Sequence, residues 1–158
     1  MNKFFEFNLN VELGEVFNEC TAYQISIEYL NKALDISNNL PINKYRLVKA
    51  YKLRGKSKMF LNNGQQKIEE QGWDLYWKAR KLNYLEAILD FSKAIEIDPE
   101  DSFLYFWRGF AYESLEEYPN AVKDLKISKQ LDPGFTLTTS ILDHIKSKGC
   151  LLYTSPSP

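Results

Sequence analysis

The sequence predicts an all-α fold built from pairs of antiparallel helices, and three observations lead to that prediction. Two segments, which begin at Leu82 and Glu116, align without a gap and lie 34 residues apart. In both segments, apolar or small residues recur at the three- and four-residue spacing of an amphipathic helix. Both helical segments then end at an Asp-Pro pair, because proline cannot donate a backbone hydrogen bond.

The first pair of helices is expected at residues 7–40. Its two helices can approach closely at Gly14, since glycine has no side chain. The pair ends at Ser37-Asn38 in place of Asp-Pro, and Asn43 is the expected cap of the next helix, so a short spacer follows. The other packing positions are Leu13, Phe17, Tyr23, Ser26, Leu30 and Ala33.

The second pair of helices is expected at residues 48–101 and contains an insertion. Its first helix carries Arg54-Gly55, which matches Arg108-Gly109 in the pair that follows. The second helix is expected to begin only near Asn83, which leaves 20 extra residues, about 62–81, in the turn between the helices.

The insertion contains Trp73 and Trp77, spaced by about one helical turn and followed by Lys78, Arg80 and Lys81. This spacing predicts a helical excursion after a glycine-containing turn. Because tryptophan is highly buried on average, core packing is the favoured role of both residues, and contact with a partner is the alternative.

The third pair of helices is expected at residues 102–135, with Gly109 as its packing glycine. Apolar residues at helical spacing then predict one more helix at residues 136–149. This helix either caps the last apolar face of the array or begins a truncated fourth pair.

The pattern of these residues resembles the tetratricopeptide repeat. The matching features are an aromatic residue, Gly and Tyr in the first helix, then Tyr-x-x-Ala, a small residue and Asp-Pro in the second. The resemblance implies a helical-hairpin solenoid of about three repeats that winds into a right-handed superhelix. It also implies that the first helices line a concave groove, which binds a protein partner.

The resemblance places three side chains of each first helix in this groove, six and three residues before the packing glycine and one residue after it. In chain order they are Asn8, Val11 and Glu15, then Lys49, Lys52 and Lys56, then Phe103, Phe106 and Phe110. We expect the lysines to face acidic side chains of a bound peptide and the phenylalanines to anchor apolar ones. Alternatively, the lysines form a solvated face and the phenylalanines pack on the inserted segment.

Charge is unevenly distributed, although 20 basic and 21 acidic residues nearly cancel. Residues 41–67 contain eight basic residues and no acidic one, whereas residues 86–124 contain ten acidic and three basic residues. The basic helix at 44–58 is also suited to nucleic acid, but an isoelectric point near 5.9 makes this the minor alternative.

One subclass of tetratricopeptide-repeat proteins holds the acidic C-terminal tails of heat-shock chaperones in a carboxylate clamp of basic and Asn residues. None of the five clamp positions in this sequence carries the required residue type. They hold Val11, Glu15, Leu53, Phe103 and Trp107. The sequence therefore predicts a protein-binding adaptor or scaffold without this clamp.

The composition argues against catalysis and metal binding. One histidine, His144, and two distant cysteines, Cys20 and Cys150, leave no zinc cluster and no Cys/His or Ser/His/Asp site. We therefore expect no enzyme activity, no cofactor and no metal, and a reducing, cytoplasmic location. No apolar run reaches the roughly 18 residues that a membrane-spanning helix requires.

The last residues, CLLYTSPSP, resemble one reading frame of the transposase adaptor used to prepare sequencing libraries. We therefore expect residues 150–158 to be an artefact and the natural chain to continue beyond Gly149. The less favoured alternative is a disordered tail with phosphorylation sites at Ser155 and Ser157. If a catalytic domain follows in the natural chain, these repeats would be its targeting module.

Overall fold

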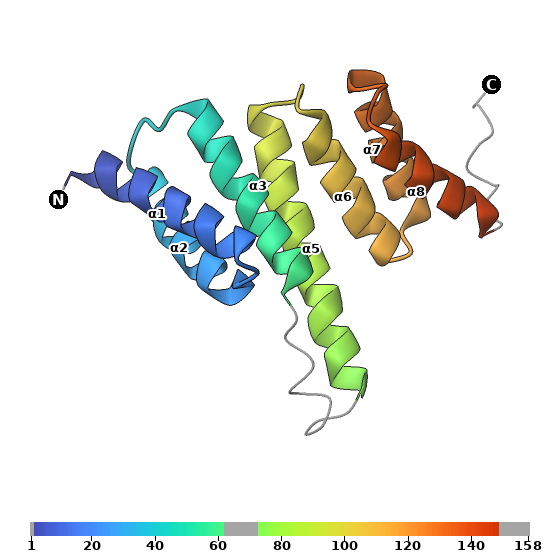
Figure 1. Ribbon diagram of the computed structural model, residues 1–158, viewed down its shortest axis with the longest axis horizontal. Helices are drawn as coiled ribbons and strands as arrows, with labels where there is room; N and C mark the ends of the chain where they lie inside the picture. The colour runs from blue at the N-terminus through green and yellow to red at the C-terminus, as the bar shows by residue number, and fades with distance from the viewer. Residues whose placement is uncertain (1, 62–72, 149–158) are drawn as a thin grey trace. The chain divides into compact units, whose positions relative to one another are not determined.

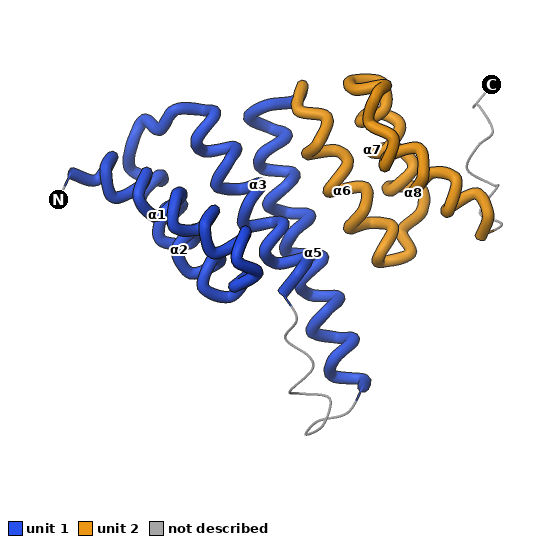
Figure 2. The backbone as a smooth tube through the Cα atoms, in the orientation of Figure 1, with its two compact units in different colours: residues 1–99 blue, residues 100–158 orange. Residues whose placement is uncertain are grey.

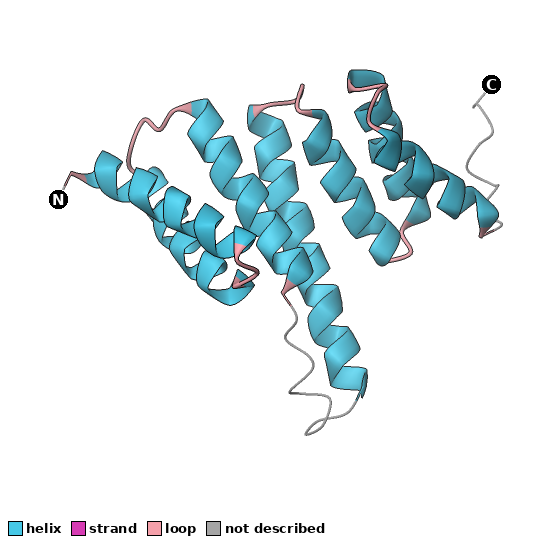
Figure 3. Cartoon of the chain, viewed as in Figure 1, coloured by secondary structure: helices cyan, strands magenta, loops and turns pink. Residues whose placement is uncertain are grey.

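The computed structural model describes residues 2–61 and 73–148 (Figure 1). Every regular element in these residues is an α-helix (Figure 3), which confirms the predicted all-α fold. The chain divides into two compact units, residues 1–99 and residues 100–158 (Figure 2). The helices are α1 (Lys3–Glu19), α2 (Tyr23–Ser37), α3 (Lys44–Phe60), α5 (Trp73–Ile97), α6 (Ser102–Ser114), α7 (Tyr118–Leu131) and α8 (Thr136–Ser147).

Unit 1 contains two helical hairpins, α1–α2 and α3–α5, and α2 also packs against α3. The start of α3 is fixed by Asn43, whose side-chain oxygen accepts a hydrogen bond of 2.9 Å from the backbone N–H of Tyr45. The cap predicted at Asn43 is therefore confirmed. One apolar cluster of this unit joins α1, α2 and α3, and its buried members are Phe7, Val11, Leu30, Ala33, Leu34, Ala50 and Leu53.

Each of the three hairpins closes over a glycine of its first helix. The glycines, each with the buried side chain that it faces on the second helix, are Gly14 and Leu30, Gly55 and Phe91, and Gly109 and Leu125. A Cβ atom added to any of these glycines would lie 2.5 to 2.9 Å from the nearest side-chain carbon. Because real Cβ contacts are essentially never that short, a larger residue would push the helices apart.

Helix α5 begins at Trp73, so the predicted start near Asn83 is wrong. Neither glycine nor proline interrupts residues 73–97, and Asp74 pairs with Lys78 one turn later at 2.8 Å, so the helix continues further toward its N-terminus. Asn83 instead lies within this helix, where its side-chain amide donates to the backbone carbonyl of Leu61 over 3.3 Å. The remainder of the predicted insertion lies outside the described residues.

Unit 2 consists of the hairpin α6–α7 and the helix α8, which packs mainly against α7. Helix α8 contributes Ile145, which is 1% exposed, to the apolar cluster of this unit. The other buried members of that cluster are Phe106, Ala121, Val122 and Leu125. The role of α8 as a cap or as the start of a fourth repeat remains a prediction, and the tail at 150–158 lies outside the described residues.

Among the described residues, none of the helices combines the length and the apolar character that crossing a membrane requires.

Candidate partner-binding surface

The basic side chains of α3 are paired with carboxylates on neighbouring helices to a greater extent than the sequence predicts. Arg46 lies 3.1 Å from Glu12, and Lys49 lies 2.6 Å from Glu15. These pairs join α3 to α1, the first helix of the preceding hairpin. Part of the positive charge that the sequence places in the groove is therefore balanced inside unit 1.

Lys49 and Glu15 are both predicted groove residues, and the structure brings them together. Burial lowers the pKa of Lys49, but the hydrogen bond to Glu15 and the charges of Glu15 and Glu12 outweigh that effect. The pKa of Lys49 therefore lies above its ordinary value of 10.5. Lys49 is thus a charged side chain whose nearest counterion is supplied by the chain itself.

Lys52 and Lys56 lie one turn apart on α3, and both are half-buried. Residues four positions apart in a helix share a face, so the two ammonium groups belong to the same side of α3. Of the first-repeat groove residues, Val11 is fully buried in the core of unit 1, and Asn8 is half-buried on α1. Val11 therefore packs inside the repeat and is not available to a partner.

A buried Arg–Asp pair recurs in the two later hairpins, and the sequence analysis did not identify it. Arg54 contacts both carboxylate oxygens of Asp90, at 3.0 and 2.6 Å, and Arg108 does the same to Asp124, at 2.6 and 2.9 Å. Each arginine comes directly before a packing glycine, Gly55 or Gly109. Each aspartate comes directly before the residue that this glycine faces, Phe91 or Leu125. This shared position was the signal that could have revealed the pairs. They link the helices of each hairpin and are not groove residues.

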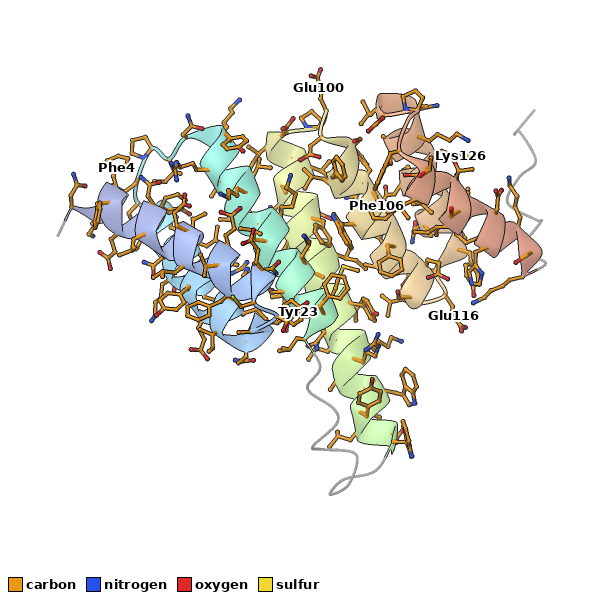
Figure 4. The ribbon with its side chains drawn as sticks, in the orientation of Figure 1. Phe4, Tyr23, Glu100, Phe106, Glu116 and Lys126 are labelled. Carbon is orange, nitrogen blue, oxygen red and sulfur yellow. The ribbon has the colours of Figure 1, made fainter. Side chains whose placement is uncertain are left out.

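The three groove phenylalanines of α6 differ in exposure. Phe106 is 5% exposed and lies in the core of unit 2, with its ring centroid 4.7 Å from that of Phe135 (Figure 4). Phe103 is 44% exposed and lies 4.8 Å from the same Phe135 ring, while Phe110 is half-buried. Of the three, Phe103 and Phe110 are the more accessible to a partner, and the ring of Phe106 stacks with that of Phe110 at a centroid distance of 6.5 Å.

Trp73 and Trp77 are exposed, at 63% and 58%, so the favoured interpretation that they pack in a core is wrong. They lie in the first turns of α5, and both rings make edge contacts with Tyr76. The reason is that the helix extends past the end of α3, where no other described helix of unit 1 covers it (Figure 1).

Comparison with known proteins agrees with the architecture. Residues 91–123 match the family model of the tetratricopeptide repeat. The chain is also 30% identical over 127 residues to the Hsp70-Hsp90 organizing protein of wheat, Triticum aestivum. That alignment covers 78% of this chain and 21% of the wheat protein, so the chain spans about a fifth of its relative's length. Together with the hairpins that close over Gly14, Gly55 and Gly109, these matches identify the chain as a tetratricopeptide-repeat protein, whose repeats form a protein–protein interaction module.

Proposed function

We propose that this protein is an adaptor that holds a peptide with acidic and apolar side chains on its first helices. The observation that carries the proposal is that Lys52 and Lys56 share one half-buried face of α3, at two of the predicted groove positions. In unit 2, the exposed ring of Phe103 and the half-buried ring of Phe110 on α6 are the candidate contacts for apolar side chains of a partner.

The ion pairs of α3 favour a protein partner over nucleic acid. Binding of a nucleic acid is driven largely by basic side chains that neutralise its phosphates and so release the counterions condensed on them. Arg46, Lys49 and Arg54 already have carboxylate partners, so a polyanion would have to displace Glu12, Glu15 and Asp90. A peptide that needs only two or three ionic contacts and otherwise buries apolar side chains fits these helices better.

The proposal is tested by reversing two charges. Lys52→Glu with Lys56→Glu should abolish recovery of partner proteins by the purified full chain in a pull-down. Lys44→Glu is the matched control, because Lys44 is an exposed residue of the same helix outside the predicted groove. Far-ultraviolet circular dichroism of all three proteins shows whether they remain folded. Equal partner recovery by the double variant and the wild type would refute the role of the two lysines.

We further propose that the groove does not hold the acidic tail of a heat-shock chaperone, although the name of the wheat relative refers to Hsp70 and Hsp90. At the clamp positions of unit 1, Val11 and Leu53 are buried, and Glu15 is an acidic residue paired with Lys49, so none of the three offers a cation or an amide to a carboxylate. We expect no binding of such a tail peptide at millimolar concentration in isothermal titration calorimetry. Micromolar affinity would contradict this proposal.

A further inference from the structure

The first turns of α5 continue the core face of this helix into an exposed region. Trp77, Tyr84 and Phe91 are spaced by seven residues, so they lie on nearly the same side of the helix. Phe91 is fully buried and Tyr84 is 7% exposed, whereas Trp77 is 58% exposed. The change occurs where α3 ends, because Leu61 lies beside Asn83. The ten residues before Asn83 extend about 15 Å further along the helix axis.

The aromatic side chains of this extension are held in place by one another. The ring of Tyr76 lies 6.1 Å from that of Trp73 and 5.1 Å from that of Trp77, in edge geometry. Arg80 donates a hydrogen bond of 2.9 Å to the hydroxyl of Tyr84, and its guanidinium lies 5.3 Å from the centre of that ring. Side chains that are already ordered lose little conformational entropy when a partner binds.

The charge of the extension indicates the chemistry of its partner. Between Trp73 and Asn83 there are three basic residues, Lys78, Arg80 and Lys81, and one acidic residue, Asp74. Asp74 is already paired with Lys78 at 2.8 Å, so the surface has a net positive charge. A second copy of the chain would bring two such surfaces together in a two-fold contact, and the like charges would repel. Anionic membranes are recognised by clusters of about four to eight basic residues, more than this surface has.

We propose that residues 73–84 form a second docking surface, separate from the first-helix groove, for a peptide segment with apolar and acidic side chains. The apolar side chains pack on the rings of Trp73, Tyr76 and Trp77, and the carboxylates lie beside Arg80 and Lys81. Large, rigid aromatic rings next to an arginine are the side chains that dominate binding energy at protein interfaces. The surface does not depend on Lys52 or Lys56.

The test uses a phage-displayed library of random peptides, selected on the full chain and counter-selected on the Trp73→Ala/Trp77→Ala variant. We expect the remaining peptides to be rich in apolar and acidic residues and to lose at least about tenfold in affinity for that variant and for Lys81→Glu. The matched control is Leu82→Ala/Leu89→Ala, which removes two exposed leucines from another face of α5. This control and the Lys52→Glu/Lys56→Glu variant should both bind these peptides normally.

Four results would overturn the proposal. One is that no peptide distinguishes the wild type from the tryptophan variant, and another is that the selected peptides lack acidic residues. A third is binding to phosphatidylserine vesicles, or dimerisation in sedimentation velocity, that the tryptophan variant abolishes. The fourth result comes from tryptophan fluorescence of the chain without a peptide, in a Trp107→Phe variant that retains only Trp73 and Trp77. We expect acrylamide to quench the emission of both tryptophans fully. Blue-shifted emission that resists quenching would show that the face is already covered.

Discussion

Replacing Asp90 by alanine should destabilise unit 1 strongly, because this one carboxylate neutralises two cations. Asp90 is 3% exposed and lies 2.6 Å from Arg54 and 3.0 Å from Lys58. Removing one partner of a buried ion pair costs about 3 to 5 kcal/mol, since the remaining charge has no counterion. Arg54 also donates to Asn31 at 2.8 Å, and Lys58 lies 3.4 Å from Glu86. These contacts partly replace the lost carboxylate, so we expect the loss of stability to lie at the lower end of that range, about 3 kcal/mol.

The assay is urea unfolding of the full chain, followed by far-ultraviolet circular dichroism. The matched control is Glu96→Ala, which removes a carboxylate from the same helix. Glu96 pairs with Lys93 at 2.9 Å, but both side chains are more than half exposed. Because exposed ion pairs contribute little, the control should unfold at the urea concentration of the wild type. The difference between the two variants then isolates the contribution of burial.

A triple variant, Arg54→Met/Lys58→Met/Asp90→Leu, separates lost charge balance from lost packing. Replacing a whole buried ion cluster by apolar side chains of similar volume is often neutral or stabilising. We therefore expect the triple variant to recover most of the stability that Asp90→Ala loses. If Asp90→Ala is as stable as Glu96→Ala, or if the triple variant is no more stable than Asp90→Ala, the reasoning is refuted.

Two further predictions concern the hairpins and their charges. Gly14→Ala and Gly109→Ala should each lower the midpoint of thermal unfolding, because overpacking costs about 1–3 kcal/mol and the better helix propensity of alanine returns only about 1 kcal/mol. Gly14→Ala should have the larger effect, since its Cβ would lie 2.5 Å from Leu30, and equal stability to wild type would contradict both. The pKa of Lys49 is raised above 10.5 in the folded chain, so its contribution to stability is complete below that pH and is lost as the pH rises through the folded pKa. Urea unfolding at increasing alkaline pH should show this loss in the wild type and less of it in Lys49→Met.

The parts of the fold that the sequence predicts correctly are those that depend on local spacing. Gly14, Gly55 and Gly109 recur at matching places in an apolar periodicity, and each one lies against the second helix of its hairpin. Asn43 caps a helix through a backbone N–H only two residues away. Such contacts are set within one helix or one hairpin, so the sequence alone contains the information that specifies them.

The side-chain partners could not be predicted in the same way. Arg46 and Glu12 are 34 residues apart, and their contact depends on how two different hairpins pack. A count of basic residues along the chain therefore overstates the free charge of α3. The burial of Phe106 could not be predicted for a related reason, because the ring packed against it, Phe135, comes from the turn before α8. The early start of α5, in contrast, was visible in the sequence as a stretch without glycine or proline.

Both hairpins with short turns share a backbone feature. Thr21 and Glu116 each follow a packing glycine by seven residues, and both have positive φ, 59° and 62°. In the sequence, Asn62 follows Gly55 by the same seven residues, and asparagine adopts positive φ more readily than most residues, so it suits the turn of a shortened hairpin. Deleting residues 63–82 would place Tyr84 nine positions after Gly55, the spacing that separates Gly109 from Tyr118.

This deletion should therefore leave the hairpin intact, because its closing contacts, Gly55 with Phe91 and Arg54 with Asp90, lie outside the removed segment. Shortening the chain between Gly55 and Phe91 from 36 to 16 residues lowers the entropy cost of closure by about 0.7 kcal/mol. The variant should unfold at a urea concentration equal to or above that of the wild type and keep the partners of the first-helix groove. It should lose only peptides that require Trp73 and Trp77. An unfolded variant would show that the extension of α5 is needed for the hairpin itself, which would contradict its assignment as a separate docking surface.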